Sequence, residues 1–385
     1  MYWIRLLFNM YFISAILVPF FTEWGGLQFS DVLFLNAWFM FWNFLLEVPT
    51  GTVADFLGRK FSITLGCVFS VIATLVYVSY PHIFVFMAAD VIFAISYTLI
   101  SGADEALVYD TLIQIGESDQ SKKVFSRLES LKLSGIMVGA VAGAFIAKSM
   151  GLRIPVLLQT IPIGISILLA LSLKEPEVHE KKPVLTFHAY KGLLKEGFHY
   201  FWGNRILKLL TLDMVLVNAS AWIIIWFYQA LLMTSGIDIV HFGFVHAMMT
   251  VSQIVIINNF ARFERWLGSK KRVLFLGAFF SGVFFILLGV TTWAPLVITG
   301  IILSAGFGLS RLPLFSSYMN KFIPSDKRAT ILSTTSMLRT LSIVIINVSA
   351  GMLSRWSIPY TLIILGAATV IFSFFSKIKE EHLID

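Results

Sequence analysis

Twelve apolar segments, each about twenty residues long, constrain the fold more than any other feature of the sequence. A helix needs roughly 20 apolar residues to cross a bilayer, and lipid offers unpaired backbone groups no partner, so segments of this length must be helices. The 385 residues are 57% hydrophobic and 13% charged, which excludes an ordinary soluble domain. We therefore predict an all-α integral membrane protein with twelve transmembrane helices near residues 2–22, 31–52, 61–80, 83–108, 125–147, 153–173, 205–233, 239–261, 272–292, 295–318, 328–351 and 356–376.

Basic residues lie mostly on one side of this array. Of the 29 Lys and Arg, 22 fall in alternate connections, which include Arg59 with Lys60, the loop after Lys174, and Lys377 with Lys379. The positive-inside rule then puts both termini and the long middle loop in the cytoplasm of a multi-pass cell-membrane protein. The net charge of +7 is accordingly a topology signal and gives no reason to expect a nucleic-acid partner.

The charged loop after the sixth segment divides the chain into two pseudo-symmetric halves. We predict an N-terminal six-helix bundle over residues 1–174 and a cytoplasmic linker over 175–204, with an interfacial helix near 185–202. A C-terminal six-helix bundle and a short cytoplasmic tail occupy 205–385. The turn FLGRK after the second segment has a degraded counterpart, WLGSKKR, after the eighth.

The stretch GTVADFLGRK, between the second and third segments, interrupts the apolar pattern with glycines and charges. Gly51, Asp55, Gly58, Arg59 and Lys60 match every position of the pattern G-x-x-x-D-x-x-G-R-K/R. With this motif, twelve helices and a mid-chain loop, the whole chain resembles the major facilitator superfamily. The resemblance implies a secondary transporter whose halves rock around a central site lined by the first, fourth, seventh and tenth helices.

The resemblance also implies a cytoplasmic gate at this turn. Asp55 would approach the positive N-terminal end of the eleventh helix, near 325–326. Arg59 would pair with an acid at the cytoplasmic end of the fourth helix, here Asp110, with Asp104 as the alternative. A basic turn that only fixes topology is the competing interpretation, although acids contribute little to orientation.

Charged side chains inside apolar segments are costly and are therefore functional candidates. Asp90 and Glu47 are candidate proton carriers, and for Glu47 a position at the cytoplasmic interface is the simpler alternative. Asp213 is a third candidate, although Arg311 at a similar depth predicts a mutual ion pair. Arg339, near the midpoint of the eleventh segment, is the first candidate for a charge that binds substrate, and Arg311 is the second.

Polar and aromatic side chains form stripes at helical spacing that could line an amphipathic pocket. Packing or lipid contact is the commoner use of such stripes in a chain with 36 Phe. A separate ridge in the fifth segment, Gly135, Gly139 and Gly143, suits close packing of helices. The substrate-binding candidates on the stripes are Asn43, Trp38, Trp42, Tyr97, Asn218, Trp222 and Trp226.

No motif for catalysis or for a cofactor is present. The sequence has no nucleotide-binding loop, no HExxH, no Cys/His cluster and a single cysteine, Cys67. We therefore predict no enzyme, no catalytic residue, no metal site and no cofactor, and energy for active transport must come from a gradient.

The expected function is proton-coupled efflux of a small organic or amphipathic compound by a monomeric antiporter that works by rocker-switch alternating access. Its partners are then the small-molecule substrate, protons or another ion, and membrane lipids. The fifth segment lacks the Gly-Pro pair of many antiporters, and Thr98 stands where many drug exporters have arginine. Uptake or facilitated transport of an organic anion therefore stays open, as does a lipid-translocating flippase or scramblase.

Overall fold

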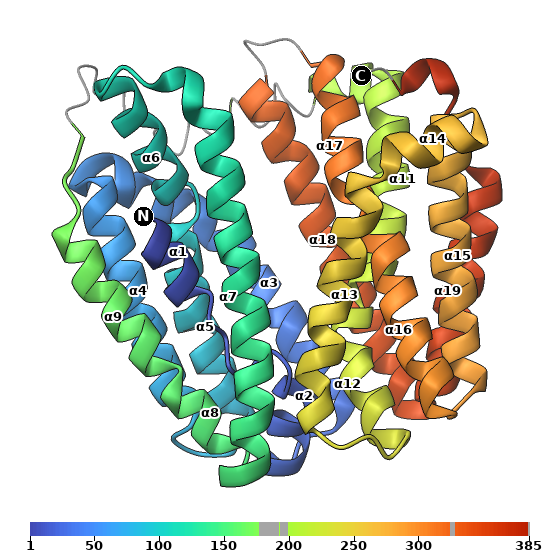
Figure 1. The fold of residues 1–385 in the computed structure, drawn as a ribbon, viewed down its shortest axis with the longest axis horizontal. Coiled ribbons are helices and arrows are strands. Elements are labelled where there is room, and N and C mark those ends of the chain that lie inside the picture. The colour runs from blue at the N-terminus through green and yellow to red at the C-terminus, as the bar shows by residue number, and fades with distance from the viewer. Residues whose placement is uncertain (177–191, 193–198, 324–327, 384–385) are drawn as a thin grey trace. The chain divides into compact units, whose positions relative to one another are not determined.

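The computed structural model describes residues 1–176, 192, 199–323 and 328–383, and within these ranges every regular element is a helix. The described residues form two compact units, which are coloured blue to green and green to red in Figure 1. Residues 239–246 group with the first unit. Eleven helical runs of the described chain are long and apolar enough to cross a membrane. The predicted all-α membrane fold is confirmed, and the first segment supplies the remaining span in broken form.

Single long helices form the second, third and fifth spans of the first unit, whereas the first, fourth and sixth spans are interrupted. The elements are α1 Tyr2–Phe8, α2 Leu17–Pro19, η1 Phe20–Trp24, α3 Phe29–Leu57, α4 Arg59–Tyr77, α5 Ile83–Ile100, α6 Ala103–Gln114, η2 Ser118–Gln120, α7 Ser121–Met150, α8 Arg153–Leu158 and α9 Thr160–Ser172.

The second unit follows a related order. Its elements, with α13 counted here although its residues up to 246 group with the first unit, are α11 Arg205–Trp222, α12 Ile224–Thr234, α13 Val240–Asn258, α14 Phe260–Leu267, α15 Lys270–Val290, α16 Ala294–Leu309, α17 Arg311–Lys321, α18 Arg328–Trp356, α19 Ile358–Phe375 and η4 Glu380–His382. α11 and α12 together form the seventh span, and α16 and α17 form the tenth. α15 packs along α19 and α16.

The first span is not the continuous helix over 2–22 that its hydropathy predicts. α1 ends at Phe8, and residues 9–16 form successive turns before α2 begins. Inside these turns the N–H of Ile13 donates a hydrogen bond to Oε1 of Gln159 (3.4 Å). The prediction of a continuous helix was wrong for this segment. Hydropathy measures only the length of an apolar run, and it does not show that a backbone N–H will bond to a distant side chain.

The glycine ridge of α7 receives the unwound segment. α1 packs against α7, and the two are neighbours in Figure 1. A Cβ added to Gly135 would collide with the carbonyl oxygen of Leu6, and one added to Gly143 would collide with that of Phe12. The backbone of the first span therefore lies directly on α7, as small residues at a membrane helix interface permit.

The fourth and tenth spans are interrupted at corresponding places. α5 gives way to α6 at Gly102, whose φ of 78° favours glycine, and α16 gives way to α17 at Ser310. Asp104 lies ten residues before the end of α6, and Arg311 lies ten residues before the end of α17. Each interruption thus sets charge at the start of the second helical piece: Asp104 and Glu105 in α6, and Arg311 in α17.

Two sequence predictions fall outside the described residues. The interfacial helix expected near 185–202 is described only at 192 and from 199, and 199–203 is helical. The side chain of Asp55 and residues 324–327, which would meet in the gate, also lie outside the description.

Candidate coupling and substrate site

α4 begins at Gly58, the sharp point of the GTVADFLGRK turn. Gly58 has φ 96° and ψ 154°, a backbone region open only to glycine. The backbone N–H groups of Arg59 and Lys60 donate to the two carboxylate oxygens of Glu175, each at 2.7 Å. A carboxylate from just beyond α9 therefore caps α4 at its positive end. Gly51, inside α3, faces open space, so no packing contact requires it.

Arg59 also joins α4 to α6. Its guanidinium forms an ion pair with Asp110 and donates a hydrogen bond to the carbonyl of Ala106 (2.7 Å). Both charged side chains are 20% exposed. The structure thus selects Asp110 as the partner of Arg59, and it uses the alternative, Asp104, in a different contact.

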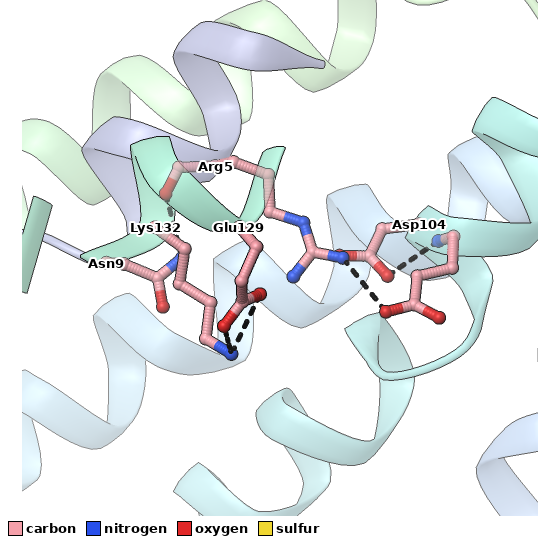
Figure 2. A network of polar contacts seen from close by, with 6 residues as sticks. Arg5, Asn9, Asp104, Glu129 and Lys132 are labelled. Carbon is pink, nitrogen blue, oxygen red and sulfur yellow. Dashed lines mark hydrogen bonds and ion pairs between the residues drawn. The ribbon is translucent and has the colours of Figure 1, made fainter. Parts of the chain in front are cut away.

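Asp104 belongs to a charged network at the meeting point of α1, α6 and α7, which Figure 2 shows. Nη2 of Arg5 lies 2.8 Å from Oδ2 of Asp104 and 3.6 Å from Oε1 of Glu105. Oδ1 of Asp104 accepts a hydrogen bond from the backbone N–H of Glu105 (2.7 Å). The Asp104 side chain is 4% exposed, whereas that of Glu105 is 66% exposed. The network therefore reaches from a buried carboxylate to an accessible one.

Two residues of α7 complete the network. Nζ of Lys132 lies 3.1 Å from Oε1 of Glu129, which makes the local pair that their spacing predicts. A cavity of about 130 Å³ adjoins the network and is lined by Arg5, Lys132, Asp104 and Glu105, among others. Nε of Arg5 is buried and has no hydrogen-bond partner among the described residues. The network combines two bases with three carboxylates, so one carboxylate lacks a base of its own.

The second unit holds a matching pair with its charges exchanged. Asp213 on α11 forms an ion pair with Arg311 on α17, as their depth in the sequence predicts. The hydroxyl of Ser376 donates to Asp213, and Nη1 of Arg311 donates to the carbonyl of Leu274. Both members are almost fully buried, at 6% and 4% side-chain exposure. The seventh span carries the acid and the tenth carries the base, the reverse of Arg5 and Asp104 on the first and fourth.

The other charged candidates stand apart from these pairs. Asp90 on α5 is 5% exposed and accepts a hydrogen bond from the hydroxyl of Tyr77. Oδ2 of Asp90 has no partner in the described part of the chain. Glu47 is exposed on α3, Arg339 is half-buried on α18, and each takes part in an interaction within the protein.

Several buried polar atoms on these stripes have no hydrogen-bond partner among the described residues. Trp38 is satisfied, since its Nε1 donates to the carbonyl of Met87 (3.1 Å), and Tyr97 is 50% exposed. Unpaired buried polar groups are rare and cost about 1–3 kcal/mol each, so a hydrogen-bonding solute would gain by meeting them. The unsatisfied atoms are Asn43 Oδ1 and Trp42 Nε1 on α3, and Asn218 Oδ1, Trp222 Nε1 and Trp226 Nε1 on α11 and α12.

Sequence reasoning missed Arg5 and the capping carboxylates. A base so near the start of the chain has the character of an orienting charge, and nothing local points from Arg5 to Asp104. Glu175 and Glu380 did carry a signal, because each is an acid that closely follows the last helix of its half. Glu380 caps α15 as Glu175 caps α4, through the N–H groups of Lys270 (2.7 Å) and Lys271 (3.0 Å).

Known proteins share both the sequence pattern and the fold. The family model of the Major Facilitator Superfamily matches residues 3–347. The uncharacterized MFS-type transporter YxaM of Bacillus subtilis (strain 168) is 22% identical over 312 residues, which is 80% of this chain and 77% of that protein.

Two solved transporters have the same fold at low sequence identity. The nucleoside transporter NupG has a TM-score of 0.77 at 13% identity, covering 98% of this chain and 99% of NupG. A D-xylose-proton symporter has a TM-score of 0.76 at 14% identity, covering 98% of this chain and 97% of that one.

Proposed function

Since the chain belongs to the Major Facilitator Superfamily, we propose that it is a secondary active transporter that exports a small organic or amphipathic compound in exchange for protons. Its two halves would alternate access to a central site. It would work as a monomer in the cell membrane, with both termini in the cytoplasm, as the distribution of basic residues implies.

The charge imbalance of the Arg5–Asp104 network carries the proposal. Arg5 and Lys132 line the cavity with Asp104 and Glu105, and Lys132 is paired with Glu129, so Arg5 is left to serve both Asp104 and Glu105. Of these two carboxylates Asp104 is the buried one, and removing a carboxylate from water favours its protonated form. Arg5 touches both Asp104 and Glu105, so it can remain paired with one while the other takes a proton. A proton bound at Asp104 would release Arg5 from its buried partner, which links protonation to the contact between α1 and α6.

Asp90 is the second candidate for the proton. Among the described residues its one hydrogen-bond partner is a neutral hydroxyl, and its second oxygen is buried and unsatisfied. It lacks an opposing base that changes partner, so a proton there would have no direct mechanical consequence. We therefore place Asp104 first and Asp90 second.

Within the second unit, the substrate would meet the unsatisfied indole and amide groups of α11 and α12, and those of α3 are separate candidates within the first unit. These groups combine apolar ring surface with isolated donors and acceptors, which suits a compound with an apolar body and a few polar substituents. Such compounds enter cells through lipid, which gives export a purpose. Arg339 and Arg311 stay candidates for an anionic group on the substrate.

The test measures proton movement in liposomes that contain the purified protein and a trapped pH dye, with solutes chosen by a thermal-stabilisation screen. Antiport predicts that the lumen acidifies while a loaded solute leaves. Asp104→Asn should abolish this signal but retain solute counterflow, whereas Asp119→Asn, an exposed acid, should retain both. Full proton movement in Asp104→Asn would overturn the assignment, and its loss in Asp90→Asn alone would move the proton to Asp90.

Uptake with protons is the second candidate function, because a protein of the same fold is a D-xylose-proton symporter. The same liposomes distinguish the two directions. In symport the lumen would become more alkaline as the solute leaves, since protons would leave with it.

A further inference from the structure

A cavity of about 370 Å³ lies within the second unit, between the start of α15 and the end of α19. Arg311 and Asp213 form part of its wall, and Lys271 and Arg272 from the first turn of α15 form another part. Its size is that of a small-molecule site. The apolar part of the wall consists of Val217, Leu274, Phe275, Ala278, Phe374 and Ile378.

Bases outnumber acids around this cavity. Lys271, Arg272 and Arg311 line it together with one acid, Asp213. A second acid, Glu380, lies beside it, but both oxygens of Glu380 accept hydrogen bonds from the first turn of α15. The cavity therefore keeps an excess of positive charge after each acid is counted against one base.

Arg311, which lines this wall, also has an unused donor. Its side chain is 4% exposed; Nη2 pairs with Asp213 and Nη1 donates to the carbonyl of Leu274. Nε is buried and finds no partner among the described residues. A planar guanidinium with a free N–H suits the oxygens of a phosphate group.

The cavity also borders an exposed aromatic surface at the end of the last span. Phe374 lines the cavity and is 64% exposed, and its neighbour Phe375 is 74% exposed. Lys377 and Lys379 follow directly in the sequence, and such bases mark the cytoplasmic end of a span. The basic wall would then lie at the depth of lipid headgroups, with the phenylalanines on the side of the acyl chains.

We propose that this cavity binds the phosphate group of an anionic phospholipid of the cytoplasmic leaflet. Lys271 and Arg272 hold the phosphate at the rim, Arg311 lies behind them, and the acyl chains run along Phe374. Free phosphate offers the same tetrahedral anion, but only a lipid also covers the aromatic surface. Basic pockets between spans on this side of a membrane are suited to such headgroups.

The test uses the purified full-length protein in neutral detergent with dioctanoyl-phosphatidylglycerol, dioctanoyl-phosphatidylcholine or inorganic phosphate. Thermal unfolding and native mass spectrometry report binding. Phosphatidylglycerol should raise the Tm and remain bound, and Lys271→Gln with Arg272→Gln should weaken its apparent affinity about tenfold. The control, Lys377→Gln with Lys379→Gln, removes the same charge nearby without changing a lining residue and should leave the affinity unchanged. Lys271→Gln alone keeps the contact of Arg272 with the carbonyl of Leu267 intact if the double variant folds poorly.

Three outcomes would overturn the proposal. Equal weakening in the control would mean a diffuse attraction to surface charge. Stabilisation by inorganic phosphate that matches phosphatidylglycerol would mean a free-anion site. Equal binding of phosphatidylcholine would mean that the headgroup charge is irrelevant.

Discussion

The two turns that begin α4 and α15 are built from the same parts, but their basic side chains contact different kinds of group: a carboxylate in the first turn, and backbone carbonyls and an aromatic ring in the second. In the first, Glu175 accepts hydrogen bonds from the N–H groups that open α4; in the second, Glu380 does the same for α15. Each acid comes from just beyond the last helix of its own unit. The shared element is thus a side-chain carboxylate that accepts hydrogen bonds from the backbone N–H groups at the start of a helix.

The difference lies in what the basic residues reach. Arg59 of the first turn pairs with Asp110 of α6. In the second turn, Lys270 and Arg272 donate to the backbone carbonyls of Leu383 (3.0 Å) and Leu267 (3.0 Å). A carboxylate partner can be exchanged or protonated, whereas a carbonyl offers a fixed contact. Of the two turns, the first is therefore the one held by an ion pair between side chains.

The buried pairs extend this contrast between the halves. The side chains of Asp213 and Arg311 are 6% and 4% exposed, and each is bonded to a further group. Arg5 is 16% exposed and shares its charge between a buried and an accessible carboxylate. The buried charges of the second unit are thus the more fully enclosed, whereas those of the first unit include an accessible carboxylate.

The largest expected loss of stability comes from breaking the buried ion pair of Asp213 and Arg311. Arg311→Leu leaves Asp213 buried without a base and should destabilise the protein by about 3–5 kcal/mol. Arg5→Leu should cost clearly less, because the Arg5 side chain is 16% exposed against 4% for Arg311, and Asp104 keeps its backbone hydrogen bond. Denaturant unfolding in detergent measures both.

Asp213→Leu combined with Arg311→Met is the control for this pair, since it removes both buried charges and should recover most of the stability. If Arg311→Leu and Arg5→Leu lost equal amounts of unfolding free energy, the argued difference in burial between the two ion pairs would be contradicted.

The next largest effect should separate the two turn glycines, Gly58 and Gly268, by the stability lost when each is replaced with alanine. Gly58 sits at φ 96° and ψ 154°, where other residues are strained by about 1–3 kcal/mol, and an added Cβ would stand 3.2 Å from the Glu175 carboxylate. Gly268 sits at φ 70° and ψ 14° with open space around it, so Gly268→Ala should cost about 1 kcal/mol. The unfolding free energies of the two alanine variants test this order. A loss of stability in Gly58→Ala that is equal to or smaller than the loss in Gly268→Ala would contradict it.

The smallest effect concerns the two caps. Glu175→Gln and Glu380→Gln each replace a carboxylate at a helix N-terminus and should each cost at most about 1 kcal/mol. Similar values would support equivalent caps, whereas a loss at only one position would show that the turns do not share this function.

Acid should abolish the contribution of Glu380. Burial raises the pKa of this carboxyl, but hydrogen bonds from Ser269, Lys271 and Lys270 outweigh it and hold the pKa below its ordinary value of 4.5. A depressed pKa stabilises the fold above the ordinary value, and the benefit is lost as the pH falls through the folded pKa. The stability difference between the wild type and Glu380→Gln should therefore shrink as the pH falls below about 4.5. A constant difference from pH 7 to pH 3 would contradict it.

Several features followed from the sequence alone because they depend on local properties. Apolar length gave eleven spans and the position of the twelfth, and the glycine pattern of GTVADFLGRK gave the turn at Gly58. The depth of Asp213 and Arg311 along their helices was enough to anticipate their pairing. Two acids on the fourth span were possible partners for Arg59, and only contact geometry separated them.

Tertiary structure decided the rest, because the relevant partners lie far apart along the chain. The first span unwinds where its backbone lies on the glycines of α7, and hydropathy contains no term for that approach. Glu175 meets the start of α4 across 116 residues, and Glu380 meets α15 across 110. Arg5 gains its role only when α6 presents Asp104 beside it. Composition and local pattern determine which segments enter the membrane, whereas the energy of a buried charge depends on what packing places within a few ångströms of it.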